Sequence, residues 1–186
     1  MKELLLLTGD NEYAIEGEIK GIAKLENLCI KEIEESLDIM GLIDLLNTSS
    51  LFDGALLYVL RNDDVLRDKE NVPHLKEYLD NPAPLNKAIV ISKSSGRGVN
   101  EETTQEEGNG KKKGKARKNP EMIKLLTNRG LTKNFPKMSY SELHRWIKEY
   151  FYSHGYKISN DAVSFLYEGV GSDQSLLVSE MDKLFL

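Results

Sequence analysis

The chain has 186 residues, of which 40% are hydrophobic and 30% charged, with a formal net charge of −5. This composition can bury the core of one domain or two small ones, which excludes collagenous, wholly disordered and disulfide-scaffold proteins. The single cysteine, Cys29, has no second thiol to pair with, and we expect it to be buried. The leucine run at residues 4–7 is too short for a signal peptide or a membrane helix, so we expect an intracellular protein with no membrane partner.

The first 135 residues alternate between short apolar runs and amphipathic segments. Apolar runs predict strands over 4–8, 27–33, 55–60, 87–92 and 132–135, and helical spacing predicts helices over 12–25, 38–47, 72–80 and 119–129. In the first helix the apolar stripe consists of Ile15, Ile19, Ile22 and Ala23. Cys29 and Ile30 are expected to enter the core from the second strand. The alternation indicates an α/β domain with a mostly parallel sheet and flanking helices.

Three further helices are predicted after Pro136. Ser139 and Glu142 form a capping-box pattern, followed by a helix that ends at Gly155 and whose apolar face holds Leu143, Trp146, Ile147, Tyr150 and Phe151. Asn160 or Asp161 is expected to cap the second helix, with apolar residues Ala162, Val163, Phe165, Leu166 and Tyr167. Ser172 is expected to start the third, with Leu176, Leu177, Met181 and Leu184. We therefore predict two domains, residues 1–136 and 137–186.

Charge is distributed unevenly along the chain. Residues 1–92 carry 18 acidic and 9 basic side chains, whereas residues 93–118 carry 4 acidic and 8 basic ones. The segment 93–118 has a single branched aliphatic residue, Val99, and no aromatic residue, so we expect a mobile loop. Its basic run could contact nucleic-acid phosphates, although a solvated insertion is the interpretation we favour. The run comprises Lys111, Lys112, Lys113, Lys115, Arg117 and Lys118.

The turn after the first strand does not match a phosphate-binding loop. Residues 9–14 read GDNEYA, where a P-loop needs glycines followed by Lys-Ser or Lys-Thr, and two acidic residues would repel a triphosphate. A glycine and lysine run at 108–116 has the wrong spacing and ends in Ala116 instead of a hydroxyl residue. The sequence therefore predicts no nucleotide cofactor.

Other catalytic patterns are also missing. Asp63 and Asp64 follow a buried strand and could hold Mg²⁺, but a polar strand end is the interpretation we favour without a phosphate cradle. The three histidines lack zinc-site spacing, and no nucleophile-elbow pattern is present. We expect no metal, no catalytic residue and no active site.

An apolar pair, Leu51 and Phe52, lies between Ser50 and Asp53 in a predicted turn. Exposed aromatic and aliphatic side chains are good anchors for a pocket on a partner protein. The pair alone does not establish a binding site for a partner. From these residues we favour the interpretation that Phe52 folds back onto the core.

The whole chain resembles the delta subunit of the clamp loader of bacterial DNA polymerase III. The resemblance rests on an ordered series of segments: LLLLTGDNEY at 4–13, SLF at 50–52, RN at 61–62, LxxWI at 143–147, GYKI at 155–158, GSD at 171–173 and EMDKL at 180–184. It implies an AAA+-like domain without a P-loop, followed by a helical lid domain.

The resemblance further implies a noncatalytic protein that binds and opens the ring-shaped sliding clamp during DNA replication. Leu51 and Phe52 would enter a pocket on the clamp, flanked by Ser49 and Ser50. Implied partners are the ATP-hydrolysing and delta-prime-like clamp-loader subunits, with DNA contacted indirectly. The implied location is a bacterial cytoplasm or nucleoid, or a phage-infected cell.

The sequence departs from the family pattern at several points. The collar domain expected after the lid is absent, so the chain is either a fragment or a shortened protein. Ser49 and Ser175 stand where relatives carry a larger apolar residue and an arginine, and the loop 93–118 is unusual. Two alternatives stay open: an AAA+ ATPase with an atypical site near Gly9 and Asp63, and a DNA-binding accessory protein that uses Lys111 to Lys118.

Overall fold

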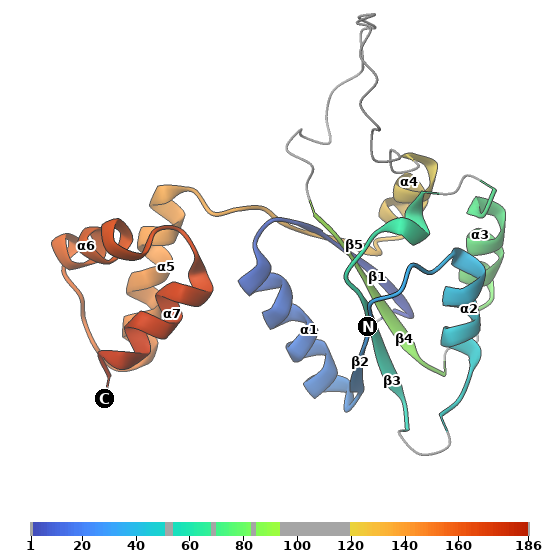
Figure 1. Ribbon diagram of the computed structural model, residues 1–186, viewed down its shortest axis with the longest axis horizontal. Coiled ribbons are helices and arrows are strands. Elements are labelled where there is room, and N and C mark those ends of the chain that lie inside the picture. Colours follow the sequence, from blue (N-terminus) through green and yellow to red (C-terminus); the bar gives the residue numbers. More distant parts are fainter. Residues whose placement is uncertain (1, 51–53, 68–69, 83–84, 94–119, 186) are drawn as a thin grey trace, which may run out of the picture. The chain divides into compact units, whose positions relative to one another are not determined.

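A computed structural model describes residues 2–50, 54–67, 70–82, 85–93 and 120–185 (Figure 1). Contacts divide the chain into two compact units, residues 1–10 with 15–135 and residues 11–14 with 136–186. We refer to them as the sheet unit and the helical unit. The expectation of mobility for 93–118 concerns residues that, apart from Lys93, lie outside the described ranges.

The sheet unit is built on five parallel strands in the order β2-β3-β4-β1-β5. The strands are β1 (Leu4–Gly9), β2 (Cys29–Ile33), β3 (Leu56–Leu60), β4 (Lys87–Ser92) and β5 (Thr132–Phe135). Parallel strands need crossover connections, and helices supply them between the strands. The predicted α/β class is confirmed.

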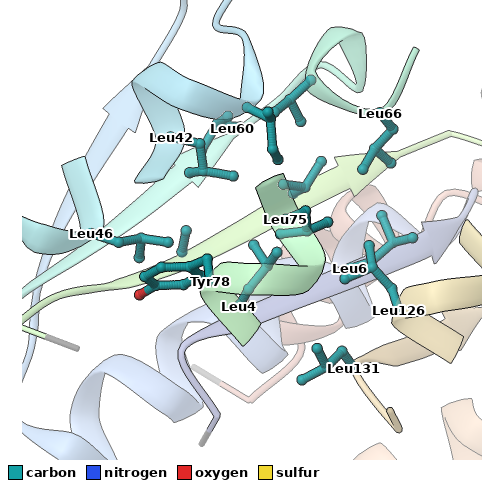
Figure 2. Packing of buried hydrophobic residues seen from close by; sticks show 14 of the residues in the cluster. Leu4, Leu6, Leu42, Leu46, Leu60, Leu66, Leu75, Tyr78, Leu126 and Leu131 are labelled. Atoms are coloured by element: carbon teal, nitrogen blue, oxygen red, sulfur yellow. The ribbon is translucent and has the colours of Figure 1, made fainter. Parts of the chain in front are cut away.

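Side chains alternate between the two faces of the sheet, as the two-residue period of a strand requires. Leu4 and Leu6 of β1 pack on one face, whereas Leu5 and Leu7 pack on the other. Helices α2 (Ile39–Asn47), α3 (Val72–Asp80) and α4 (Pro120–Asn128), with the short 3₁₀ helix η1 (Asp64–Leu66), cover the first face (Figures 1 and 2). Helix α1 (Glu12–Glu26) covers the second.

The predicted apolar stripes explain this layering. The buried residues of α1 are the four expected from its spacing, Ile15, Ile19, Ile22 and Ala23. On the other face, Leu42 and Leu46 of α2 approach Tyr78 and Leu75 of α3 in one continuous cluster (Figure 2). Each fully buried leucine of this kind contributes about 1.5–3 kcal/mol of transfer free energy.

The expectation of burial for Cys29 and Ile30 was wrong. Both side chains are exposed, Ile30 at 44% of its surface. The physical reason is the place of β2 at the edge of the sheet, since its one partner among the described strands is β3. Of its five residues, only Ile33 packs partly against a core cluster.

The helical unit contains α5 (Tyr140–Ser153), α6 (Asn160–Val170) and α7 (Gln174–Lys183). Its buried core comprises Leu143, Ile147, Phe151, Val163, Leu177 and Met181. The expected capping box is present, because Ser139 Oγ accepts from Glu142 N and the Glu142 carboxylate accepts from Ser139 N. The Ser139 hydroxyl, which also donates to the Glu142 carboxylate at 2.7 Å, and the Ser139 backbone N–H hold the pKa of Glu142 below its usual range.

The expected cap of α6, Asn160 or Asp161, was wrong, and α7 begins at Gln174 instead of the expected Ser172. Ser159, with an extended backbone, caps α6 by accepting from Ala162 N, and the Asn160 side chain instead accepts from Lys148. Asp173 caps α7 through Ser175 N and Leu176 N. Four residues named as apolar residues of these two helices are exposed, namely Ala162, Phe165 at 76%, Leu176 and Leu184.

Candidate partner-binding site

The connection between α2 and β3 carries the predicted clamp-binding residues. It follows Asn47, the last residue of α2, and enters β3 at Leu56. Ser49 is exposed and Ser50 is half-buried. Leu51 and Phe52 lie outside the described residues, so their exposure stays a prediction.

Helix α2 is held firmly on the sheet up to the start of this connection. Asp38 caps its first turn, where its Oδ1 accepts from Gly41 N at 2.8 Å. Leu42 and Leu46 are fully buried in the core cluster beneath the helix. In the last turn the Thr48 hydroxyl donates to Asp44 O at 2.7 Å. The chain therefore leaves the helix from a packed and hydrogen-bonded end.

The buried amide of Asn86, just before β4, joins both ends of the connection. Its Nδ2 donates to Leu45 O at 2.9 Å and to Thr48 O at 2.6 Å, at the end of α2. Its Oδ1 accepts from Leu56 N at 3.0 Å, at the start of β3. Its backbone N–H donates to Leu46 O at 3.2 Å. The same residue thus contacts the chain before and after residues 49–55.

The sequence reasoning missed Asn86. A polar residue directly before the apolar run of β4 is a weak signal, because such a position is normally an exposed strand start. Here the side chain is 1% exposed. A buried amide is stable only when hydrogen-bonded, and its partners are main-chain groups that are 30 to 41 positions away in the sequence.

The turn after β1, the candidate nucleotide site, is occupied by the protein's own contacts. Gly9 has φ +117°, and a Cβ at this position would lie 2.0 Å from Phe135 O. The glycine is therefore required by the close approach of β5. The buried side chain of Asn11 accepts from Ala14 N at 3.0 Å, so it takes one of the first-turn amides of α1 that a phosphate would need.

The two aspartates after β3 are paired with protein groups. Asp63 accepts from Arg67 at 3.1 Å and from the Ser92 hydroxyl at 2.9 Å. Asp64 pairs with Arg67 at 2.8 Å and accepts from the Ser36 hydroxyl at 3.1 Å. Among the described residues, no group of three or more His, Cys, Asp or Glu side chains is placed to hold a metal ion. These contacts are those of a polar strand end.

Arg61, the first residue after β3, ties neighbouring elements together. Its guanidinium forms a two-pronged pair with Glu32 of β2, with N–O distances of 2.9 and 2.6 Å, and a third bond to Glu16 of α1 at 2.5 Å. The hydrogen bonds lower the pKa of Glu32 and raise that of Arg61. Arg61 thus has a structural role at this edge of the sheet.

The basic run from Lys111 to Lys118, which the sequence offered as a DNA contact, lies outside the described residues. Its role stays a prediction. Within the described ranges, no helix has both the length and the apolar character needed to cross a membrane.

Comparisons with known proteins find similarity at the level of structure. No family model matches the sequence, and no curated protein matches it. Among solved structures, the chain is similar to the DNA clamp loader delta protein YqeN of Bacillus subtilis, with a TM-score of 0.62 and 18% sequence identity. The match covers 100% of this chain and 53% of that protein, so the chain spans about half its length. The chain therefore shares the fold of a clamp-loader delta protein throughout the region compared.

Proposed function

We propose that this chain is a noncatalytic delta-type subunit of a bacterial clamp loader, and that it binds and opens a ring-shaped sliding clamp. The observation that carries the proposal is the structural likeness to a clamp loader delta protein, which extends over the whole of this chain. The order of sequence segments that resemble the delta family gives further support, because it depends on the sequence and not on the fold.

Leu51 and Phe52 are the proposed anchors for the clamp. An adjacent leucine and phenylalanine can fill an apolar pocket, and a few such residues supply most of the binding energy of a protein interface. Support comes from the hydrogen bonds at the two ends of the connection, where the Asn86 side chain bonds to Thr48 O and to Leu56 N. Binding would open the ring if the pair has higher affinity for the clamp surface in its open form.

The absence of ATPase activity is part of the proposal. Asn11 uses an amide that a phosphate would need, and Asp63 is engaged by Arg67 and Ser92 instead of facing an open metal position. ATP would be hydrolysed by the neighbouring subunits of the loader, which include a delta-prime-like one. DNA would be contacted indirectly, through the assembled loader in the cytoplasm.

The first test is the affinity of the full chain for a bacterial sliding clamp. The double variant Leu51→Ala/Phe52→Ala is expected to lose about 2–5 kcal/mol of binding free energy, because hot-spot truncation has this cost. The matched control is Leu85→Ala, which removes an exposed leucine next to Asn86 and leaves the proposed anchors intact. Circular dichroism establishes that the variants are folded. A folded double variant that binds as tightly as the wild type contradicts the proposed surface.

The second test separates this proposal from an ATP-binding enzyme. We expect a titration of the chain with labelled ATP and Mg²⁺ to show no saturable binding in the micromolar range. Saturable binding that is lost in Asp63→Ala would replace the noncatalytic proposal with an atypical nucleotide site.

A further inference from the structure

We infer that Asn86 is a positioning residue for the clamp-binding connection, an inference that rests on the proposed function. Its amide joins the last turn of α2 to the first residue of β3, and so holds the two described ends between which Leu51 and Phe52 lie in the sequence. Asn86 itself is buried and does not touch a partner.

The geometry singles out this residue. The two N–H groups of the amide donate to Leu45 O and Thr48 O, and the oxygen accepts from Leu56 N, at 2.9, 2.6 and 3.0 Å. Both donors and one acceptor site of the amide are therefore used. The amide joins two carbonyl groups at the end of α2 to an N–H group at the start of β3, which belong to different secondary-structure elements. The backbone N–H of Asn86 adds a bond to Leu46 O.

The groups that bond to the Asn86 side chain lie at the end of a helix and at the start of a strand, where main-chain groups need hydrogen-bond partners. The last carbonyl groups of a helix have no partner within the helix, and Leu45, Leu46 and Thr48 present such groups at the end of α2. Leu56 is the first residue of β3. Without the Asn86 side-chain amide, Leu45 O, Thr48 O and Leu56 N would lose these bonds or would move to reach water, whereas Leu46 O keeps its bond from the backbone N–H of residue 86.

Only a short carboxamide satisfies all three partners. Asn86→Asp keeps the acceptor for Leu56 N but, when ionised, turns an oxygen without a proton toward two carbonyl oxygens that it repels. Asn86→Leu keeps the approximate size and removes every polar atom. The two variants therefore separate the bonds to α2 from the side chain's contribution to packing.

A residue that only stabilises the sheet unit would give a different pattern from a positioning residue. Ile19→Ala is the matched control, since Ile19 is also buried but belongs to α1 and packs on the opposite face of the sheet. Destabilisation alone would affect Ile19→Ala and the Asn86 variants in similar ways. Positioning predicts that clamp affinity falls only when Asn86 is changed.

The experiment combines clamp affinity with hydrogen exchange on the full chain. Under conditions in which circular dichroism shows all variants folded, we expect Asn86→Asp and Asn86→Leu to weaken clamp binding at least about tenfold, and Ile19→Ala to change it less than about twofold. Exchange at Leu56 N is expected to accelerate in Asn86→Leu, which loses the acceptor, and to stay close to the wild-type rate in Asn86→Asp, which keeps it, and in Ile19→Ala.

A pH series adds a readout that lost stability alone does not produce. Burial raises the pKa of the carboxyl in Asn86→Asp, and the protonated form regains one donor for α2. The gap in clamp affinity between this variant and the wild type should therefore narrow from about pH 7.5 to about pH 5.5. The gap for Asn86→Leu should stay constant.

The outcomes separate the inference from the function on which it rests. If the wild type binds a clamp and Leu51→Ala/Phe52→Ala does not, while both Asn86 variants bind like the wild type, the positioning role is overturned and the proposed function stands. If the wild type binds no clamp, the proposed function fails. Hydrogen exchange at Leu56 N then tests whether Asn86 holds the ends of the connection. Unchanged protection of Leu56 N in Asn86→Leu would then overturn the role of Asn86 in holding the ends of the connection, and faster exchange there but not in Ile19→Ala would support it.

Discussion

The two edges of the same parallel sheet are organised in opposite ways. At the carboxyl edge, where open α/β sheets usually bind ligands, Arg61, Asp63 and Arg67 are paired with other protein groups. At the amino edge, the amide of Asn86 ties together the ends of a connection that carries an apolar pair. At the carboxyl edge these side chains are engaged within the protein, whereas at the amino edge the buried amide holds the two ends of the connection that the proposed function assigns to partner binding.

The largest expected loss of stability comes from an alanine substitution at Gly9, compared with the same substitution at Gly54 near the other edge. Gly9→Ala should destabilise the sheet unit by at least about 3 kcal/mol, because the new Cβ would overlap Phe135 O in a backbone conformation that alanine disfavours. Gly54→Ala, near the amino edge, has φ +68° with no atom near the new Cβ, and should cost about 1 kcal/mol. Urea unfolding followed by circular dichroism compares the two. Equal costs would show that the carboxyl edge is not closed by β5.

The next effect concerns the helix that leads into the connection. Leu46→Ala removes a fully buried side chain from the last turn of α2 and should cost about 2–5 kcal/mol. Met40→Ala, on the exposed side of the same helix, is the control and should cost less than about 1 kcal/mol. Hydrogen exchange of the sheet amides reports the stability of this unit separately. Similar protection in both variants would argue against a packed end for α2.

A smaller effect is expected from the paired aspartate at the carboxyl edge. Asp63→Ala removes the bonds to Arg67 and Ser92 and should cost about 1–2 kcal/mol. Asp63→Asn can keep one of these bonds and should cost less. A structural aspartate predicts this ranking in urea unfolding, whereas a gain in stability on removing Asp63 would indicate an unpaired acidic site.

The smallest effect is the pH dependence of two ion pairs. A hydrogen bond from Lys87 at the amino edge lowers the pKa of Glu26, and one from Arg61 at the carboxyl edge lowers that of Glu32. Both carboxyls bind protons more weakly when folded, so their contribution is complete above the ordinary glutamate pKa and is lost as pH falls through the lowered value. Exposure of both side chains limits the Arg61–Glu32 pair to about 1 kcal/mol or less.

NMR titration of the glutamate carboxyls tests this pH dependence. Lys87→Met should return the Glu26 pKa toward its ordinary value without moving that of Glu32, and Arg61→Met should do the reverse. A chain whose stability rises on acidification through this range would contradict both assignments.

Much of the fold was predictable because its signals are local. The strands over 87–92 and 132–135 and the helix over 72–80 coincide with β4, β5 and α3, since each is a short periodic run bounded by turn residues. The failures concern exposure. Cys29 and Ile30 look like core residues but occupy an edge strand. Phe165 is apolar but lies on the exposed side of α6.

The candidate site was predictable only in part, for the same reason. Leu51 and Phe52 attract notice because they are adjacent apolar residues in a turn, a pattern visible in the sequence itself. Asn86 carries no such mark. Its importance comes from partners in α2 and β3, which reach it only because β3 and β4 are neighbours in the sheet.

The sequence by itself determined the succession of strands and helices along the chain, the apolar stripes of the helices and the mismatch of residues 9–14 to the P-loop motif. These features depend on residues close together in the chain. The tertiary structure alone decided which strand lies at the edge, which carboxylates are paired and which amide holds the α2–β3 connection. Those features depend on hydrogen bonds and burial between segments tens of residues apart, and no local pattern encodes them.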